Sequence, residues 1–336
     1  MVTRLDSWLA LTEEKPIEPG LPICDPHHHF WDRPDDRYLL DELLRDTGEG
    51  HRVVQTVFVE CRSMYRTDGA TELRPVGEIE FVRDITAGSA SGPTAAAAGI
   101  VGYADFNLGS AVTPVLEAHL AAGDHRFRGI RCTAAWDASP EITTAKTTSA
   151  GLLSDPKWRE GFACLGEFGL SFDAIVYHPQ LSELADLARA FPDVTIILNH
   201  VGRPLGIGAY AGKRDEIFPD WQKGIAEVAA CPNVMVKVGG LGNPISGFDW
   251  HERKMPPTSR EVAEAVSPYY LFCIEKFGPE RCMFESNFPV DKQSYSYTVC
   301  WNVFKRIAKD FSGVEQAALF HDTAARAYRL PLLSAR

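Results

Sequence analysis

The sequence predicts a single α/β domain folded as a (β/α)8 TIM barrel. Eight short runs of apolar and β-branched residues alternate with amphipathic stretches along almost the whole 336-residue chain. Continuous apolar strands that alternate with helices are typical of a parallel sheet covered by helices, and eight such units close a barrel. A doubly wound open sheet is the competing fold, but no Gly-x-Gly-x-x-Gly turn follows the first strand.

The expected strands and helices follow one another in order. The strands are predicted at Ile23–Trp31, Val53–Cys61, Gly99–Leu108, Phe127–Ala134, Leu170–Tyr177, Thr195–Gly202, Val234–Leu241 and Arg281–Phe288. The helices are predicted at Glu78–Ala87, Pro114–Ala122, Pro156–Phe168, Leu181–Phe191, Trp221–Ala230, Ser259–Phe277 and Tyr297–Phe311, with a weaker candidate at Leu39–Arg45. The barrel then takes up residues 23–330. Residues 1–22 form an N-terminal extension that could cap the barrel bottom or pack on a neighbouring molecule.

Two segments are predicted as loops. Thr86–Gly99 is rich in Ala, Gly and Ser, which predicts a surface connection without chemistry. The loop at 242–258 is longer and follows the seventh strand. Loops on the C-terminal side of barrel strands make substrate contacts, so this one is either a lid or specificity segment, or else a variable surface excursion.

Composition and charge narrow the class of protein. The chain has 34 Lys and Arg against 45 Asp and Glu, a formal net charge of −11, so it has no basic excess for nucleic-acid phosphates. Hydrophobic residues make up 45% and charged residues 24%, as in a globular protein with a large core. Charged residues interrupt Met1–Pro22, which leaves no stretch suited to export or membrane insertion. Eight scattered cysteines read as reduced core thiols. We expect a cytoplasmic protein whose oligomeric state, a homo-oligomer included, stays open.

The strongest chemical signal is Asp25-Pro26-His27-His28-His29-Phe30-Trp31 at the end of the first strand. Side chains two apart on a strand point to the same side, so His27 and His29 are predicted to enter the barrel mouth while His28 points away. Two converging imidazoles are typical of a zinc-type site or a catalytic pair. A histidine run without function is the alternative, and its position inside an apolar strand end argues against it.

Polar side chains also stand at the same end of later strands. They are Arg131 on strand four, His178 on strand five, His200 on strand six, Lys237 on strand seven, and Glu285 with Asn287 on strand eight. A single histidine at one of these positions would predict only a buried core side chain. Their repetition at equivalent positions is the layout of a barrel active site.

These motifs together resemble the amidohydrolase superfamily. The chain is most similar to its amidohydrolase-related group, which contains 2-pyrone-4,6-dicarboxylate lactonase and sugar-acid lactonases. The resemblance covers about residues 20 to 330 and rests on motifs in order along successive strands: Asp-x-His-x-His-Phe-Trp, Gly-Ile-Arg, His-Pro, Asn-His-x-Gly-Arg-Pro, Lys-x-Gly-Gly and Ser-x-x-Pro-Val.

The resemblance implies a role for each matched position. His27 and His29 match the family's metal-binding or catalytic pair, and His178 matches a third ligand of the metal-dependent decarboxylases. His200 matches the histidine that polarises the scissile carbonyl or moves a proton, and Arg131 matches a position near the substrate carboxylate. The implied cofactor is a divalent metal, zinc or manganese, although some lactonases of this group work without one.

Strand eight departs from the family pattern. Relatives carry Asp within Gly-Ser-Asp-Trp-Pro, where it activates water, whereas this chain reads Glu285-Ser286-Asn287-Phe288-Pro289. An amide cannot accept a proton as a carboxylate does. Either the carboxyl group has moved to Glu285, on the same face one layer deeper, or Asp291 or a metal hydroxide with His200 replaces it. An engineered substrate trap and a loss of hydrolysis stay open as well.

The sequence therefore predicts hydrolysis of a lactone or similar cyclic ester of a small carboxylic acid. A metal is expected at His27, His29 and His178, and catalysis by His200, Glu285 and Asn287. The expected substrate-binding residues are Arg131, Lys237, Arg203 and His251. Two other functions stay open: decarboxylation of an aromatic or muconate-type acid, indicated by Tyr177-His178-Pro179, and a catalytically silent barrel that binds a small acid, indicated by Asn287.

Overall fold

A computed structural model describes residues 4–34, 36–142 and 148–331. Eight parallel strands form one sheet in chain order: β1 (Pro22–His28), β4 (Arg52–Val59), β5 (Ala95–Gly102), β6 (Phe127–Ile130), β7 (Ser171–Ala174), β8 (Ile196–Leu198), β9 (Val234–Gly239) and β10 (Cys282–Glu285). A bridge between His28 and Phe288, with the His29 N–H donating to the Phe288 carbonyl at 2.8 Å, joins the end of the sheet back to its beginning. The predicted barrel is confirmed.

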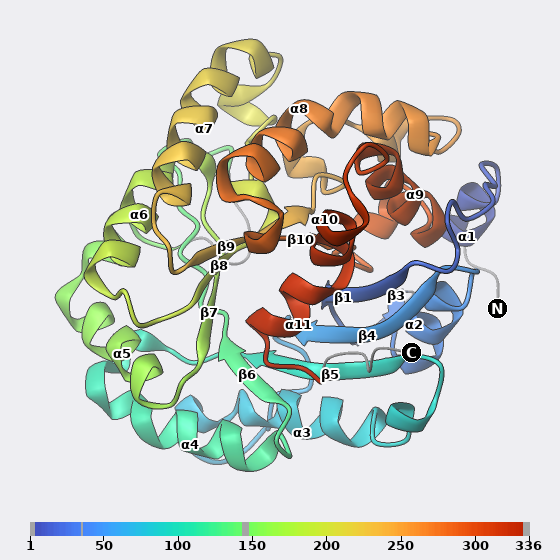
Figure 1. Ribbon diagram of the computed structural model, residues 1–336. Coiled ribbons are helices and arrows are strands. Elements are labelled where there is room, and N and C mark those ends of the chain that lie inside the picture. The colour runs from blue at the N-terminus through green and yellow to red at the C-terminus, as the bar shows by residue number, and fades with distance from the viewer. Residues whose placement is uncertain (1–3, 35, 143–147, 332–336) are drawn as a thin grey trace.

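One helix follows each barrel strand and covers its outer face (Figure 1). These helices are α2 (Leu40–Thr47), α3 (Val76–Ile85), α4 (Thr113–Ala122), α5 (Pro156–Glu167), α6 (Leu181–Ala190), α7 (Arg214–Ala229), α8 (Ser259–Phe277) and α9 (Tyr297–Ile307). Helix α7 begins well before its predicted start at Trp221, because it accommodates Pro219 internally at the loss of one backbone hydrogen bond. In the described part of the chain, no helix combines the length and apolarity that crossing a membrane requires.

Two strand boundaries differ from the prediction. Strand β1 ends at His28 because the chain then turns into a small antiparallel pair, β2 (Trp31–Arg33) and β3 (Asp36–Tyr38). Strand β5 begins at Ala95, inside the segment predicted as a loop. Its small residues leave room for Leu330, since a Cβ on Gly99 would lie only 3.1 Å from Leu330 Cδ2.

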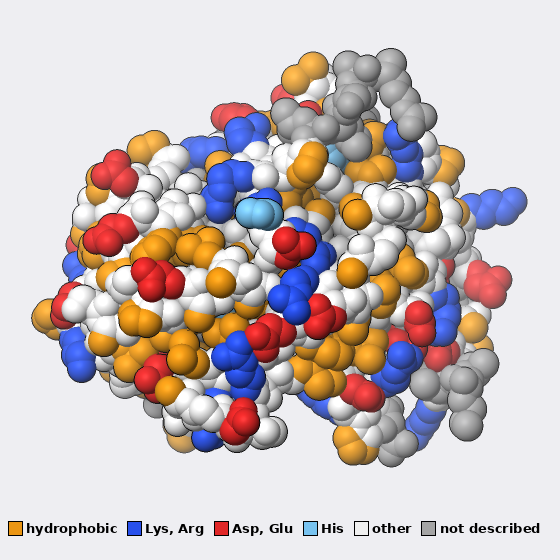
Figure 2. Space-filling view, turned by 90° about the horizontal axis from the view of Figure 1, so that it is seen from below, with side chains coloured by type: hydrophobic (Ala, Val, Ile, Leu, Met, Phe, Trp, Pro, Cys, Tyr) orange, Lys and Arg blue, Asp and Glu red, His pale blue; other side chains and the backbone are white. Residues whose placement is uncertain are grey.

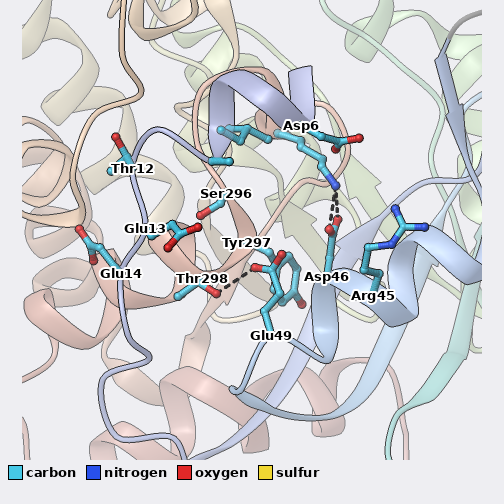
Figure 3. Close-up of a pocket in the computed structure, with 13 residues that line it drawn as sticks. Asp6, Thr12, Glu13, Glu14, Arg45, Asp46, Glu49, Ser296, Tyr297 and Thr298 are labelled. Carbon is cyan, nitrogen blue, oxygen red and sulfur yellow. Dashed lines mark hydrogen bonds and ion pairs between the residues drawn. The ribbon is translucent and has the colours of Figure 1, made fainter. Parts of the chain in front are cut away.

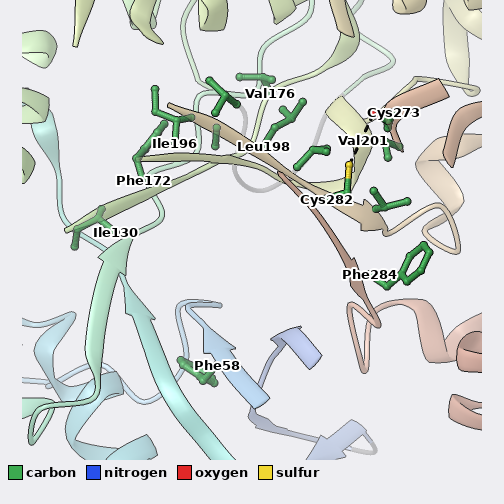
Figure 4. Close-up of a cluster of buried hydrophobic side chains, with 14 of the residues drawn as sticks. Phe58, Ile130, Phe172, Val176, Ile196, Leu198, Val201, Cys273, Cys282 and Phe284 are labelled. Carbon is green, nitrogen blue, oxygen red and sulfur yellow. Dashed lines mark hydrogen bonds between the residues drawn. The ribbon is translucent and has the colours of Figure 1, made fainter. Parts of the chain in front are cut away.

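Side chains along the strands alternate between two cores. Phe58, Leu198 and Phe284 point outward and pack under the helices (Figure 4). Their neighbours Val59 and Met283 belong instead to a second cluster in the barrel interior. This period of two follows from strand geometry and brings Glu285, two residues beyond Met283, inside the barrel. All eight cysteines are buried and free, as predicted.

The C-terminal part of the chain packs against the barrel strands. A π-helical turn at 318–322 and α11 (Thr323–Ala327) lie against β1 and β10, and helix α10 (Gly313–Ala317) packs on the π-helical turn (Figure 1). Tyr328 and Leu330 join the interior cluster with Cys24 and Val57. The bottom of the barrel is therefore closed by this segment rather than by the N-terminal extension.

The N-terminal extension packs beside the long loop instead. It begins with α1 (Arg4–Leu9), in which the Trp8 indole N–H donates to the Arg253 carbonyl at 3.0 Å. The Thr12 hydroxyl donates to the Pro256 carbonyl at 2.8 Å. The loop at 242–258 is thus tied to the extension near its C-terminal end.

Charged side chains of both signs are interspersed over the face seen from below (Figure 2). Acidic and basic groups alternate between apolar patches on this face and do not gather by sign. Such a mixed face lacks the basic stripe by which proteins bind nucleic-acid phosphates.

Candidate active site

Three side chains at the C-terminal ends of β1, β8 and β10 form a buried cluster of His27, His200 and Glu285. Glu285 lies between the two imidazoles: its Oε1 is 2.7 Å from His200 Nδ1, and its Oε2 is 2.7 Å from His27 Nδ1. The backbone N–H of His200 also donates to Oε1 at 3.1 Å. A carboxyl group on strand eight therefore reaches the histidines from Glu285.

Two glycines at the end of β9 make room for this contact. A Cβ on Gly239 would meet the side chain and carbonyl of Glu285, and a Cβ on Gly240 would collide with the His200 imidazole. Gly240 also has φ +74°, a left-handed conformation that side chains other than glycine rarely adopt. The Lys-x-Gly-Gly motif is thus a steric requirement of the His200–Glu285 pair.

We expect the substitution Gly240→Ala to abolish activity, because the added methyl group must displace the His200 ring. Gly212→Ala is the matched control, since Gly212 has φ +73° but no atom within 4 Å of its Cβ position. The control should lose only the roughly 1 kcal/mol of left-handed strain. Activity and chemical denaturation of both variants check this expectation, and equal losses in the two would contradict the steric role of Gly240.

Burial controls the protonation of the cluster. It raises the pKa of Glu285 to about 7, an effect that Lys237 and the His200 backbone N–H partly offset. It lowers the pKa of both His27 and His200 well below the usual value, and nearby cations lower them further. His200 is thus neutral. With Nδ1 donating to Glu285, its Nε2 carries a lone pair, and this buried atom has no hydrogen-bond partner among the described residues.

Two cations flank His27. Arg131 Nη1 lies 3.3 Å from His27 Nε2, and Lys237 Nζ lies 3.2 Å from His27 Nδ1. Arg131 also pairs with Glu60, from Nε to Oε1 at 2.8 Å, and Lys237 donates to Asp173 Oδ1 at 2.7 Å. Both cations are almost fully buried. Their donors are directed to Glu60, Asp173 and His27 within the barrel.

Arg203 is differently placed. It follows β8 in a left-handed stretch in which His200, Val201 and Arg203 all have positive φ, a strained backbone of the kind found at functional sites. Its guanidinium makes no hydrogen bond or ion pair with the described residues, and it is one of the charges that lower the pKa of His200. Of the predicted anchors, Arg203 best keeps free donors near the cluster.

The other predicted histidines stand outside the three-residue cluster. The His29 ring lies edge-on to His27 with centroids 4.9 Å apart, and its Nδ1 is 2.7 Å from the Val59 carbonyl. His28 packs on Phe30 and Phe58, away from the cluster as predicted.

His178 and His251 are not brought to the cluster either. His178 accepts the Leu205 backbone N–H at 3.2 Å and lines a pocket with residues of α6 and α7. A short helical turn that begins at His178 directs the side chain there. His251 is partly exposed on the long loop, 3.9 Å from Glu252.

Asn287 is bound to a neighbouring carboxylate. Its amide donates to Asp291 Oδ1 at 2.7 Å, while Asp291 Oδ2 accepts from the Gly242 N–H at 2.8 Å and the Tyr295 hydroxyl at 3.1 Å. Burial raises the pKa of Asp291 to about 7. This arrangement ties the start of the long loop to strand eight, and it occupies both Asp291 oxygens.

Glu60 and Asp173 were missed by the sequence analysis. Both are fully buried partners of site cations. The sequence feature that could have identified them is a single carboxylate within an apolar strand, in Phe-Val-Glu-Cys and in Ser-Phe-Asp-Ala. A buried carboxylate requires a nearby cation, which Arg131 and Lys237 supply.

The donor set fits a divalent metal. His27, His200 and Glu285 each offer one ligand atom, and these atoms lie within 4.8 Å of one another. Two imidazole nitrogens and one carboxylate oxygen are a combination found in catalytic zinc sites. The unpartnered lone pair of His200 Nε2 favours a cation. Of the predicted set of His27, His29 and His178, His27 belongs to this group of donors.

A separate cavity lies between the N-terminal extension, α2 and the start of α9 (Figure 3). It has a volume of about 700 Å³ and is lined by Asp46, Glu49, Lys292 and Tyr297 among others. Lys292 pairs with Asp46 at 2.7 Å, and the Thr298 hydroxyl donates to Glu49 at 2.9 Å. None of the predicted site residues lines it.

Comparisons with known proteins show which proteins this chain resembles. The chain is 33% identical over 332 residues to the uncharacterized protein y4mH of Sinorhizobium fredii, which covers 92% of this chain and 99% of that protein. It is 26% identical over 317 residues to an L-fucono-1,5-lactonase of Burkholderia ambifaria, covering 91% and 95% of the two chains.

A crystal structure of an amidohydrolase from Burkholderia multivorans with bound zinc has the same fold. Its TM-score is 0.71 at 22% identity, over 92% of this chain and 99% of that one. The family model described as "Amidohydrolase" matches residues 24–330. With this match along almost its whole length, the chain belongs to the amidohydrolase family of hydrolytic enzymes.

Proposed function

We propose that this protein hydrolyses the lactone of a small sugar acid or a related carboxylic acid. The observation that carries the proposal is the buried His27–Glu285–His200 cluster at the C-terminal ends of the barrel strands, with the Arg203 guanidinium near it. The similarity to L-fucono-1,5-lactonases along most of the chain supports a lactone as substrate.

The cluster has the parts that ester hydrolysis needs. Glu285 accepts from His200 Nδ1 and thereby holds the tautomer in which Nε2 can take a proton from water. The water oxygen then attacks the lactone carbonyl carbon, and Glu285 stabilises the imidazolium that forms. When the ring C–O bond breaks, His200 returns the proton to the departing ring oxygen, so that a hydroxy acid is released.

Arg203 complements the charge that develops in this reaction. Its guanidinium has donors to spare for the oxygens of the reacting carbonyl and for the carboxylate of the opened product. Burial lowers the pKa of His27 and keeps its ring neutral, and Lys237 and Arg131, held by their own buried ion pairs, lower this pKa further.

A divalent metal, zinc first, would be held by His27, His200 and Glu285. When bound, such an ion supplies a Lewis acid and lowers the pKa of water. Support for it comes from the donor set and from the zinc in the neighbouring Burkholderia multivorans structure. His200 Nε2 also provides a proton acceptor when no ion is bound.

The test is a panel of lactones assayed by proton release with the purified protein, before and after removal of metal by a chelator. The panel includes L-fucono-1,5-lactone, L-rhamnono-γ-lactone and 2-pyrone-4,6-dicarboxylate. We expect turnover of at least one lactone and loss of that turnover in His200→Asn. Restoration by zinc of a chelated sample would assign the metal a role, and full activity without metal would remove it from the mechanism.

The two other functions have less support in this arrangement. Decarboxylation was indicated by His178, which lies outside the cluster. A silent barrel was indicated by Asn287, but Glu285 supplies a carboxylate two residues earlier. Release of carbon dioxide from an aromatic acid without lactone turnover would select the first. Tight binding of a small acid with no turnover of any compound would select the second.

A further inference from the structure

Residues 328–331 reach the barrel interior below the candidate active site. Tyr328 is fully buried in the interior cluster with Cys24, Val59 and Met283. Two hydrogen bonds hold this segment: the Gln55 amide donates to the Pro331 carbonyl at 2.9 Å, and the Arg329 guanidinium donates to the Arg128 carbonyl at 2.9 Å. Tyr328 thus approaches the site residues from the bottom of the barrel.

The Tyr328 hydroxyl belongs to the same buried network as the catalytic cluster. It donates to Asp173 Oδ1 at 2.8 Å, the oxygen to which Lys237 Nζ also donates at 2.7 Å. Lys237 Nζ lies 5.3 Å from the centre of the Tyr328 ring and 3.2 Å from His27 Nδ1. Tyr328, Asp173 and Lys237 are all fully buried. One tyrosine therefore contacts both members of the ion pair that borders His27.

We infer that Tyr328 is a positioning residue that sets where the Lys237 ammonium stands relative to His27. A buried ion pair keeps its geometry only when further hydrogen bonds satisfy the remaining lone pairs. The phenol supplies such a bond to Asp173 Oδ1, the same oxygen to which Lys237 donates. Without it, the ammonium is free to move toward the vacated lone pair and away from His27.

This inference makes the C-terminal segment part of the active site, although it lies at the opposite end of the barrel. It rests on the proposed function only for its activity readout. Small displacements at a reacting centre have large effects on rate, because reacting groups must be held in a narrow range of positions. The role is one of placement, since the Tyr328 hydroxyl is already used by Asp173.

Two variants separate placement from packing. Tyr328→Phe keeps the ring and removes only the hydroxyl, whereas Leu330→Ala weakens the same interior cluster without touching the network. We expect Tyr328→Phe to lower kcat about tenfold with KM changed by less than about twofold. Leu330→Ala should lower the free energy of unfolding and leave kcat unchanged.

A second measurement does not depend on activity. In protein labelled with 15N-lysine, the buried Lys237 ammonium should give a slowly exchanging signal, assigned by its loss in Lys237→Arg. We expect Tyr328→Phe to accelerate the exchange of this signal severalfold and Leu330→Ala to leave it unchanged. If the wild-type protein opens no lactone, the proposed function fails but the exchange measurement still decides this inference. An unchanged signal in Tyr328→Phe, or the same change in Leu330→Ala, would overturn it.

Discussion

The substitution Glu285→Gln is expected to lower kcat by about 10²–10⁴-fold, the usual contribution of a positioned acid or base. Glutamine has nearly the same size, so the packing around His27 and His200 is retained. The glutamine amide carries no charge that could stabilise a His200 imidazolium. Its NH2 group is a hydrogen-bond donor, so it cannot accept the bond that His200 Nδ1 now donates to the carboxylate. The measurement is steady-state kinetics on whichever lactone the wild-type protein opens, with chemical denaturation as the check on folding.

A second buried carboxylate provides the control for this prediction. Glu78 accepts the backbone N–H groups of Cys61 and Ser63 at 3.0 and 2.8 Å, outside the cluster. Glu78→Gln should cost stability and leave kcat within about twofold of the wild-type value, since it touches no reacting group. If Glu285→Gln retains activity, the carboxylate is not part of the proton transfer and the proposed mechanism fails.

The substitution Lys237→Met is expected to destabilise the protein by about 3–5 kcal/mol. Lys237 and Asp173 are both fully buried, and their atoms are 2.7 Å apart. Removal of the ammonium leaves the Asp173 carboxylate without a charge partner in the barrel interior, and this uncompensated charge is what costs the free energy. Urea denaturation measures the loss.

Two comparisons make this prediction specific. The double variant Lys237→Met with Asp173→Asn removes both charges and should recover most of the lost stability. Arg189→Met breaks the ion pair with Glu227, whose atoms are 3.1 Å apart on the surface, and should cost less than about 1 kcal/mol. Equal losses from the buried and the surface pair would contradict the account of the buried network.

Some features of the site were predictable because they depend on local geometry. The alternation of side chains along β10 places Glu285 inside the barrel whatever lies around it, and the same holds for Val59 and Met283. The closure of eight strand and helix units into a barrel likewise follows from the pattern of apolar runs.

Other features were not predictable, because a short local element redirects a side chain. His178 directly follows the predicted strand Leu170–Tyr177, at the end of the barrel where the site was expected. The helical turn that begins at His178 directs its ring toward α7 instead. Strand β1 has an irregular register between Asp25 and His28, which shows that its alternation is not maintained to the end. The prediction for His27 assumed a regular alternation of side chains, which β1 does not keep.

The amino-acid pattern predicts that eight strands alternate with helices and that polar residues stand at the C-terminal ends of the strands. Both features depend on the spacing of apolar and polar side chains over a few neighbouring positions, which hydrophobic periodicity reports directly. The partners of the site cations were not predictable in this way, because they lie far from the cations in the sequence. Arg131 meets Glu60 from 71 residues away, Lys237 meets Asp173 from 64, and Tyr328 meets Asp173 from 155. Such pairs form only when the barrel closes and its bottom is filled, because burial then forces each charge to find a partner within reach.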